Sequence, residues 1–233
     1  MTLSQHDHSG QVQRVQRAQF AARYQTQAPR LPEGKLDLST LWPLAPEQRL
    51  ELDLGFGRGL SLITRVEHCP QACIIGIESK AKWTCKVHQQ LENRGLHKQA
   101  RVFCEDMRLF LARCEPANSV HSVSLHFPDP WWKKRHSGRR VIDDSLIQQI
   151  VRLLRPEGTL LIQTDVEERA LMYLSVLQSN PYLAPYSNNF FVDVNPLHAV
   201  SNRERRATED GLPIWRLHAI KKASELNKNQ PEA

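Results

Sequence analysis

The chain has 233 residues, of which 40% are hydrophobic, and its formal net charge is +6. This size suits one domain with extensions, and the positive balance favours an anionic partner. No apolar run reaches the roughly 18 residues of a membrane span, and the first ten residues lack the apolar stretch of a secretory signal. Five cysteines without a CxxC pair argue against a zinc site and a disulfide framework, and they fit a cytoplasmic protein.

Composition divides the chain into three parts. Residues 1–45 form a polar leader, partly helical or disordered, in which Leu41 and Trp42 are expected to pack against the core. Residues 46–222 carry the folded domain. Residues 223–233 form a polar tail that is expected to fray.

Short apolar runs alternate with segments of helical periodicity through the middle of the chain, which predicts βαβ units. Strands are predicted at 50–54, 73–77, 101–104, 120–127 and 159–164, and helices at 60–67, 80–94, 107–114, 143–154 and 166–179. Two late strands are predicted at 190–194 and 214–220, arranged as a hairpin. The pattern indicates an α/β, Rossmann-like three-layer sandwich with a mostly parallel sheet and a late antiparallel strand.

A glycine-rich turn follows the first predicted strand, where Asp53 precedes Gly55, Gly57 and Gly59. Glycines let the backbone turn tightly and approach a ligand closely. The dinucleotide fingerprint needs Gly or Ala at the next position, which is Leu60 here. The spacing instead resembles the first motif of class I S-adenosylmethionine-dependent methyltransferases, whose ammonium group suits an acid such as Asp53. A glycine turn without a ligand is the alternative.

Two further acids follow the next predicted strands. Glu78 ends the second strand, where a carboxylate can accept both hydroxyls of a ribose. Asp106 follows the third strand, where a carboxylate can accept from an adenine amino group, and Glu105 is its rival. Each acid alone is equally consistent with an exposed loop residue. Three acids after three consecutive strands favour one cofactor site.

The most informative segment begins at Phe127 and reads FPDPWWKKRHSGRR. Its two prolines hold Asp129 in a stiff turn at the end of the fourth predicted strand. Ligands of open parallel sheets bind beyond the carboxyl ends of strands. A rigid acid, paired tryptophans and a run of cations at that place indicate a site for a base on a phosphate backbone. A plain turn with a solvated basic loop is the alternative.

Two later segments bring charged residues to the same region. Asp165 follows the fifth predicted strand, where it could contact a base, orient a basic residue, or cap the next helix. The cluster from Ser201 to Arg206 contains one acid, Glu204, among its cations, and a charged surface turn is the alternative reading.

In this order, over about residues 50–220, the motifs resemble those of the bacterial tRNA (guanine-N7-)-methyltransferases, which methylate a guanine in the tRNA variable loop. The resemblance implies S-adenosylmethionine as cofactor, tRNA as partner, and no metal or membrane. It implies that Asp129 is the catalytic acid. It also implies cofactor contacts from Asp53, Gly55, Gly57, Gly59, Glu78 and Asp106, substrate contacts from Lys133, Asp165, Ser201, Arg203 and Glu204, and tRNA backbone contacts from Lys134, Arg135, Arg139 and Arg140.

The sequence departs from the family pattern in its leader, which lacks a clear counterpart of the family's basic N-terminal segment, and at three positions of the domain. Asp53 stands where the family usually has Glu, His126 where it usually has Phe, and Arg203 where an aromatic residue is usual. An arginine can still stack on a base or pair with phosphate. Two alternatives follow: a methyltransferase with a different acceptor, and an RNA-binding paralogue with little catalysis. An intact cofactor motif argues against the second.

Guanine N7 carries a lone pair, so its methylation needs no general base. Catalysis is expected to rest on alignment and electrostatics. We expect Asp129 to face the positive charge that passes to the purine, and Glu204 to read the N1–H and amino edge of the guanine. One of Trp131 and Trp132 is expected to stack on a base, and the other to pack beneath the loop.

Overall fold

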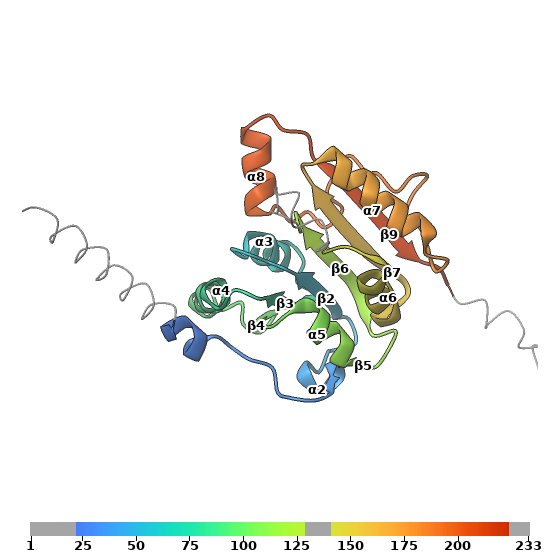
Figure 1. The fold of residues 1–233 in the computed structure, drawn as a ribbon. Coiled ribbons are helices and arrows are strands. Elements are labelled where there is room, and N and C mark those ends of the chain that lie inside the picture. Colours follow the sequence, from blue (N-terminus) through green and yellow to red (C-terminus); the bar gives the residue numbers. More distant parts are fainter. Residues whose placement is uncertain (1–21, 129–140, 224–233) are drawn as a thin grey trace, which may run out of the picture.

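A seven-stranded sheet forms the centre of the computed structural model, which describes residues 22–128 and 141–223 (Figure 1). The strand order is β4-β3-β2-β6-β7-β9-β8. Pairings from β4 to β7 are parallel, whereas β9 runs antiparallel to both β7 and β8. The strands are β2 (Arg49–Leu54), β3 (Ala72–Glu78), β4 (Ala100–Cys104), β6 (Val120–His126), β7 (Leu154–Thr164), β8 (Leu183–Pro185) and β9 (Trp215–Lys221).

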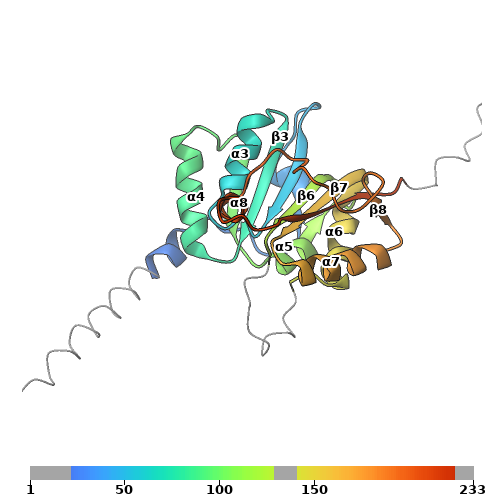
Figure 2. The ribbon, with the colours of Figure 1, turned by 90° about the horizontal axis from the view of Figure 1, so that it is seen from above.

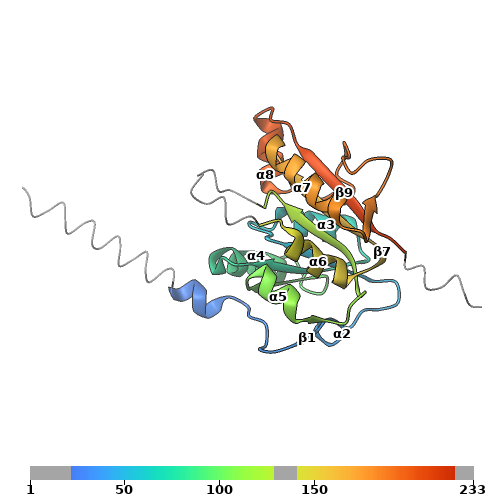
Figure 3. The same ribbon diagram turned by 45° about the vertical axis from the view of Figure 1, so that its right-hand side comes forward.

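Helices cover both faces of the sheet, which confirms the predicted three-layer α/β fold with a late antiparallel strand (Figure 2). One face carries α3 (Leu60–His68) and α4 (Ala81–Asn93). The other face carries α5 (Met107–Arg113), α6 (Asp144–Leu153) and α7 (Glu167–Ser179), which lie side by side in Figure 3. A further helix, α8 (Asn202–Glu209), lies beside the carboxyl ends of β6 and β7 (Figure 1).

Side chains alternate across the strands and build a separate core on each face. Leu50, Leu52 and Leu54 of β2 join the larger core, which α5, α6 and α7 close. Leu62 of α3 and Val87 of α4 belong to the smaller core on the opposite face. Burial on both faces explains why β3 is a nearly continuous apolar run, whereas β2 and β6 alternate apolar with polar residues.

On the face of the sheet that carries α3, the part formed by β2, β6 and β7 is polar. Glu51 of β2 receives two hydrogen bonds from Arg65 of α3, at 2.6 and 2.9 Å, and the same guanidinium donates to Leu197 O at 3.0 Å. The segment 195–201 and α8 cover this face. Its buried polar side chains are therefore held by ion pairs and hydrogen bonds rather than by apolar packing. They include Glu51, Asp53, Ser122, Ser124 and Gln163.

A cleft of about 280 Å³ opens at the amino-terminal end of this polar face. His218 lies in its wall, 3% exposed, with Tyr186 stacked at 4.2 Å between ring centroids. Neither ring nitrogen of His218 has a hydrogen-bond partner among the described residues. Burial lowers the pKa of His218 to about 4, because the charged imidazolium is poorly solvated there.

The described part of the leader lies against the domain. Residues 22–27 are helical. The short strand β1 (Leu36–Asp37) pairs in parallel with β5 (Cys114–Glu115), and α2 (Leu38–Leu41) follows it. Trp42 is buried and Leu41 packs against the same core, as expected. The three-part division of the chain stays a prediction.

One predicted strand is wrong. Residues 190–194 form no strand, and the strand that pairs with the outer edge of β9 is β8, which was not predicted. Phe191 makes only an isolated bridge to Leu217. β8 and the segment around Phe191 meet the same edge of β9, where β8 pairs with Ala219–Lys221 and the Phe191 segment bonds to the first half of the strand, at residues 216–218. The late hairpin is also wrong, since α8 intervenes.

Candidate functional site

Three of the predicted acids reach one edge of the sheet because they end neighbouring parallel strands. Asp53 is the penultimate residue of β2, and Glu78 is the last residue of β3. Asp106 follows β4 after one intervening residue. The carboxyl ends of parallel strands meet at the same edge, which is where ligands bind in this class of sheet.

The glycine turn links two of these positions. Gly55, Gly57 and Gly59 all have positive φ, at 77°, 57° and 77°. The Gly57 N–H donates to Glu78 Oε2 at 3.1 Å. At Gly59, a Cβ would lie 2.6 Å from the Val87 side chain, so any larger residue would clash where α3 approaches α4. The turn is thus fixed by local geometry and by the acid of the next strand.

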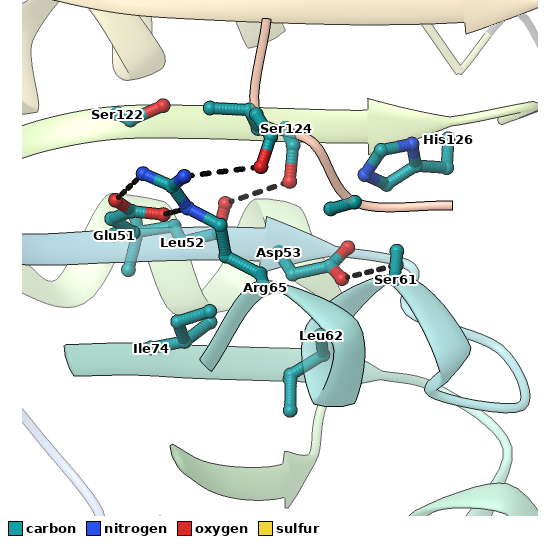
Figure 4. Close-up of a pocket in the computed structure, with 12 residues that line it drawn as sticks. Glu51, Leu52, Asp53, Ser61, Leu62, Arg65, Ile74, Ser122, Ser124 and His126 are labelled. Carbon is teal, nitrogen blue, oxygen red and sulfur yellow. Dashed lines mark hydrogen bonds and ion pairs between the residues drawn. The ribbon is translucent and has the colours of Figure 1, made fainter. Parts of the chain in front are cut away.

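Asp53 is 3% exposed and lies beneath the start of α3 (Figure 4). Its Oδ2 accepts a hydrogen bond from Ser61 Oγ at 2.9 Å, whereas Oδ1 has no partner among the described residues. Burial raises the pKa of the Asp53 carboxyl, against the opposing effects of His126 and Ser61. A buried acceptor without a donor fits a positively charged ligand group such as an ammonium.

Glu78 and Asp106 differ in their surroundings. Glu78 is 8% exposed, and its Oε1 accepts from Lys80 N at 2.8 Å. Asp106 is exposed and caps α5, accepting from Arg108 N at 2.8 Å and Leu109 N at 3.3 Å. The rival acid, Glu105, is paired with Arg113 at 3.4 Å. These contacts leave Asp106, rather than Glu105, facing the solvent at this edge.

The chain leaves the sheet at the end of β6 and returns before α6. Phe127, with φ of 52°, is followed by Pro128, and Val141 is the next described residue. Arg108 of α5 holds the returning chain by donating to Val141 O at 2.9 Å and to Asp143. The predicted catalytic and tRNA-binding residues of this loop lie outside the described residues; they are Asp129, Trp131, Trp132, Lys133, Lys134, Arg135, Arg139 and Arg140.

Asp165 is paired with the Arg203 guanidinium, which joins the end of β7 to α8. The alternative that Asp165 caps the following helix is wrong. Val166 is the N-cap residue of α7 and provides no side-chain cap. Thr164 Oγ1 instead accepts from Val166 N at 3.3 Å. The pair with Arg203 instead agrees with the prediction that Asp165 orients a basic residue.

Glu204 is 5% exposed, and its carboxylate accepts hydrogen bonds from several elements. Oε1 accepts from Arg216 Nη2 at 2.8 Å and from Gln163 Nε2 at 3.3 Å. Oε2 accepts from Asn195 Nδ2 at 3.3 Å and from Ser201 N at 3.4 Å. Since a carboxylate offers about four lone-pair sites, a guanine edge would reach Glu204 only by displacing one of these donors.

Ser201 and Glu204 also define the start of α8. Ser201 Oγ accepts from Glu204 N at 3.0 Å, and the Glu204 side chain accepts from Ser201 N, which completes a capping box. Ser201 is 7% exposed. Both residues are therefore fixed by the helix start, and Arg203 extends from the same turn toward Asp165.

Several polar residues of this region were not predicted. His126 Nδ1 lies 2.6 Å from Gln163 Oε1. An amide oxygen only accepts, so Nδ1 donates and Nε2 carries no proton in the neutral ring. His126, Gln163, Glu204 and Arg216 therefore form one hydrogen-bonded chain across β6, β7, α8 and β9. A glutamine within the apolar run of β7 was the available signal.

Comparison with known proteins identifies the family. A family model described as a putative methyltransferase matches residues 47–217. The tRNA (guanine-N(7)-)-methyltransferase of Anaeromyxobacter dehalogenans is 34% identical over 173 residues, covering 74% of this chain and 86% of the relative. That of Idiomarina loihiensis is 31% identical over 209 residues, covering 89% and 84%. The chain belongs to the tRNA (guanine-N7-)-methyltransferase family.

The fold agrees with this assignment. The crystal structure of the 16S rRNA methyltransferase KamB superposes with a TM-score of 0.53 and 13% identity, covering 83% of this chain and 96% of KamB. This likeness shows the class I methyltransferase fold. The predicted family, fold class and enzyme class are therefore confirmed. Within residues 22–128 and 141–223, no helix has the length and hydropathy to cross a membrane, and no three His, Cys, Asp or Glu side chains are grouped to hold a metal.

Proposed function

We propose that this family member transfers the methyl group of S-adenosylmethionine to N7 of a guanine in the tRNA variable loop. The observation that carries the proposal is the grouping of polar residues at the carboxyl edge of the sheet. There Asp53 and His126 line one pocket, and His126 is linked through Gln163 to Glu204, which supports neighbouring sites for the cofactor and the acceptor. The family's named activity requires both sites.

The cofactor would be held by the turn and the three acids. S-adenosylmethionine supplies a methyl group on a positively charged sulfur. Asp53 Oδ1 has no donor in the described part of the chain and would accept from its ammonium group, directly or through water. Glu78 would accept from the ribose hydroxyls and Asp106 from the adenine amino group. The positive φ of Gly55 and Gly57 permits close approach of a ligand to the backbone.

The acceptor side would provide alignment and charge rather than proton abstraction. Guanine N7 attacks with its own lone pair, so the protein has to hold the base in line and exclude other orientations. Asp129 would face the purine as it becomes positive. Lys133, Asp165, Ser201 and Arg203 would contact the substrate, and Glu204 would read the guanine edge after giving up one of its present donors.

The basic loop would hold the RNA backbone. Lys134, Arg135, Arg139 and Arg140 would contact tRNA phosphates, which makes binding sensitive to salt. tRNA is a cytoplasmic substrate in bacteria, and we therefore propose a cytoplasmic location.

The direct test measures methyl transfer from labelled cofactor to unmodified tRNA, followed by nucleoside analysis. We expect N7-methylguanosine confined to the variable loop. Asp129→Ala is expected to abolish most of the transfer while the affinity for tRNA is nearly kept. An equal loss of transfer and binding would remove Asp129 from its catalytic role.

The Arg203–Asp165 pair supports one alternative, a methyltransferase with a changed acceptor. Calorimetric titration with cofactor separates both enzyme readings from an RNA-binding paralogue. A wild-type chain that binds tRNA but takes up no cofactor would contradict both. Cofactor uptake with methylation of another nucleotide would support the changed acceptor.

A further inference from the structure

Three cations surround one aromatic ring at the start of α4. The Arg58 guanidinium carbon lies 5.1 Å from the centroid of Trp83, and the ammonium groups of Lys82 and Lys86 lie at 5.6 and 5.8 Å. Arg58 comes from the glycine turn, whereas the other three residues come from the first half of α4. The Trp83 cluster, as we name these four residues, therefore joins two separate elements.

None of these cations has an acidic partner within the described part of the chain. Arg58, Lys82 and Lys86 are exposed and form no ion pair or side-chain hydrogen bond there. Other exposed cations do pair, as Lys35 does with Glu115 at 3.0 Å and Arg94 with Glu67 at 2.8 Å. The Trp83 cluster thus carries uncompensated positive charge beside an aromatic surface.

Like charges that converge on one ring repel one another, and helix residues four apart with the same sign are destabilising. Lys82 and Lys86 have this spacing on α4. A polyanion would relieve the repulsion. An exposed cation–π contact is weaker than the stacking of a nucleobase on an aromatic ring, so a base can replace one cation over Trp83 and leave that cation free for a phosphate.

We propose that the Trp83 cluster is a nucleotide-binding site for RNA, with an unstacked base on the Trp83 ring and backbone phosphates on Arg58, Lys82 and Lys86. The inference rests on the proposed function, since it places a second contact of the same tRNA on α4. It assigns RNA contacts to residues outside the basic loop.

The position of the cluster suits this role. Arg58 lies between Gly57 and Gly59 of the cofactor turn, and α4 begins three residues after Glu78. An RNA strand whose guanine enters the site at the sheet edge would therefore pass close to the cluster. Stacking platforms combined with a positive track are how proteins hold unpaired nucleotides without reading their sequence.

The experiment measures tRNA affinity by filter binding across a salt series, for the full chain and its variants. Trp83→Leu is expected to raise Kd about 5- to 150-fold, whereas Trp83→Phe, which keeps a π-face, should stay near wild type. Lys82→Gln with Lys86→Gln should weaken binding and lower the salt slope by about 1 to 2. The matched control removes two exposed lysines elsewhere, Lys35→Gln with Lys98→Gln, and should leave the slope nearly unchanged.

Two results would overturn the inference. One is a salt slope for the Lys82 and Lys86 variant that equals the control, together with unchanged affinity in Trp83→Leu. The other is loss of cofactor binding by Trp83→Leu in calorimetry without RNA, which would make the ring a wall of the cofactor site. Failure of the proposed function would be seen in a different measurement. The wild-type protein would then form no N7-methylguanosine, whether or not these variants weaken RNA binding.

Discussion

Arg216 Nη2 lies 2.8 Å from Glu204 Oε1, and this ion pair connects β9 to α8 behind the candidate acceptor site. The side chains are only 15% and 6% exposed. A buried pair of this kind is costly to break, because the remaining charge loses its partner without gaining water.

Arg216→Met should therefore lower the free energy of unfolding by about 3 to 5 kcal/mol at neutral pH. Urea denaturation measures the change. The control is Arg206→Met, since Arg206 pairs with Asp210 on the same helix at 73% and 49% side-chain exposure. Its effect should stay below about 1 kcal/mol. Equal effects for the two variants would show that Glu204 does not depend on Arg216.

Arg203→Gln tests the pair with Asp165. The Arg203 side chain is 37% exposed but that of Asp165 only 9%, so removal of the guanidinium leaves a nearly buried carboxylate without its donor and should lower the free energy of unfolding by about 1 to 3 kcal/mol. Methyl transfer should fall, because the Asp165 carboxylate loses the contact that orients it. Steady-state kinetics on tRNA measures the fall, with Arg205→Gln, an exposed neighbour, as control. Full activity in Arg203→Gln would mean that the pair has no part in the reaction.

Gly59→Ala should destabilise the protein more than Gly95→Ala does. Both glycines have positive φ, at 77° and 69°, so both substitutions strain the backbone by about 1 to 2 kcal/mol. Only at Gly59 would the new Cβ meet a neighbour, the Val87 side chain at 2.6 Å. Adding Val87→Ala to Gly59→Ala should relieve the clash but create a cavity. Denaturation of all three variants measures the difference, and equal losses for the two glycines would exclude the clash.

His218 predicts a pH dependence. Its pKa is about 4 in the folded protein and near 6.5 when exposed. The unfolded chain therefore binds the proton first, so stability is full above about pH 6.5 and falls as the pH drops toward 4, by up to about 3 kcal/mol. His218→Leu should remove this contribution and flatten the profile. Denaturation at pH 7 and pH 4.5 checks it, and an unchanged pH slope in the variant would contradict the assignment.

The sequence predicted the central fold well because strands buried on both faces carry a strong local signal. β3 is a nearly continuous apolar run, β2 and β6 alternate apolar with polar residues, and Asp53 and Glu78 reach one edge because they lie at the carboxyl ends of neighbouring parallel strands. Residues 190–194 were misassigned because pairing depends on which segment reaches the β9 edge. Local composition does not determine that competition.

The surroundings of Glu204 were harder to predict. Its donors Gln163 and Arg216 lie 41 and 12 residues away, and their meeting depends on the register of β7 with β9. The capping box could be recognised in the sequence, because Ser201 and Glu204 have the required spacing. The alternative was a charged surface turn, and only the burial of Glu204 in the structure shows that its side chain belongs to the interior.

The order of the strands constrains how the protein is made. β9 is inserted between β7 and β8, although it is the last described strand to be synthesised. A nascent chain that ends before Trp215 therefore holds β7 with an open edge, and Glu204 without its counter-ion. The ribosome must release the whole of β9 before the candidate acceptor site around Glu204 can form. Until then the chain exposes an unpaired strand edge, which is the form most open to chaperones and proteases.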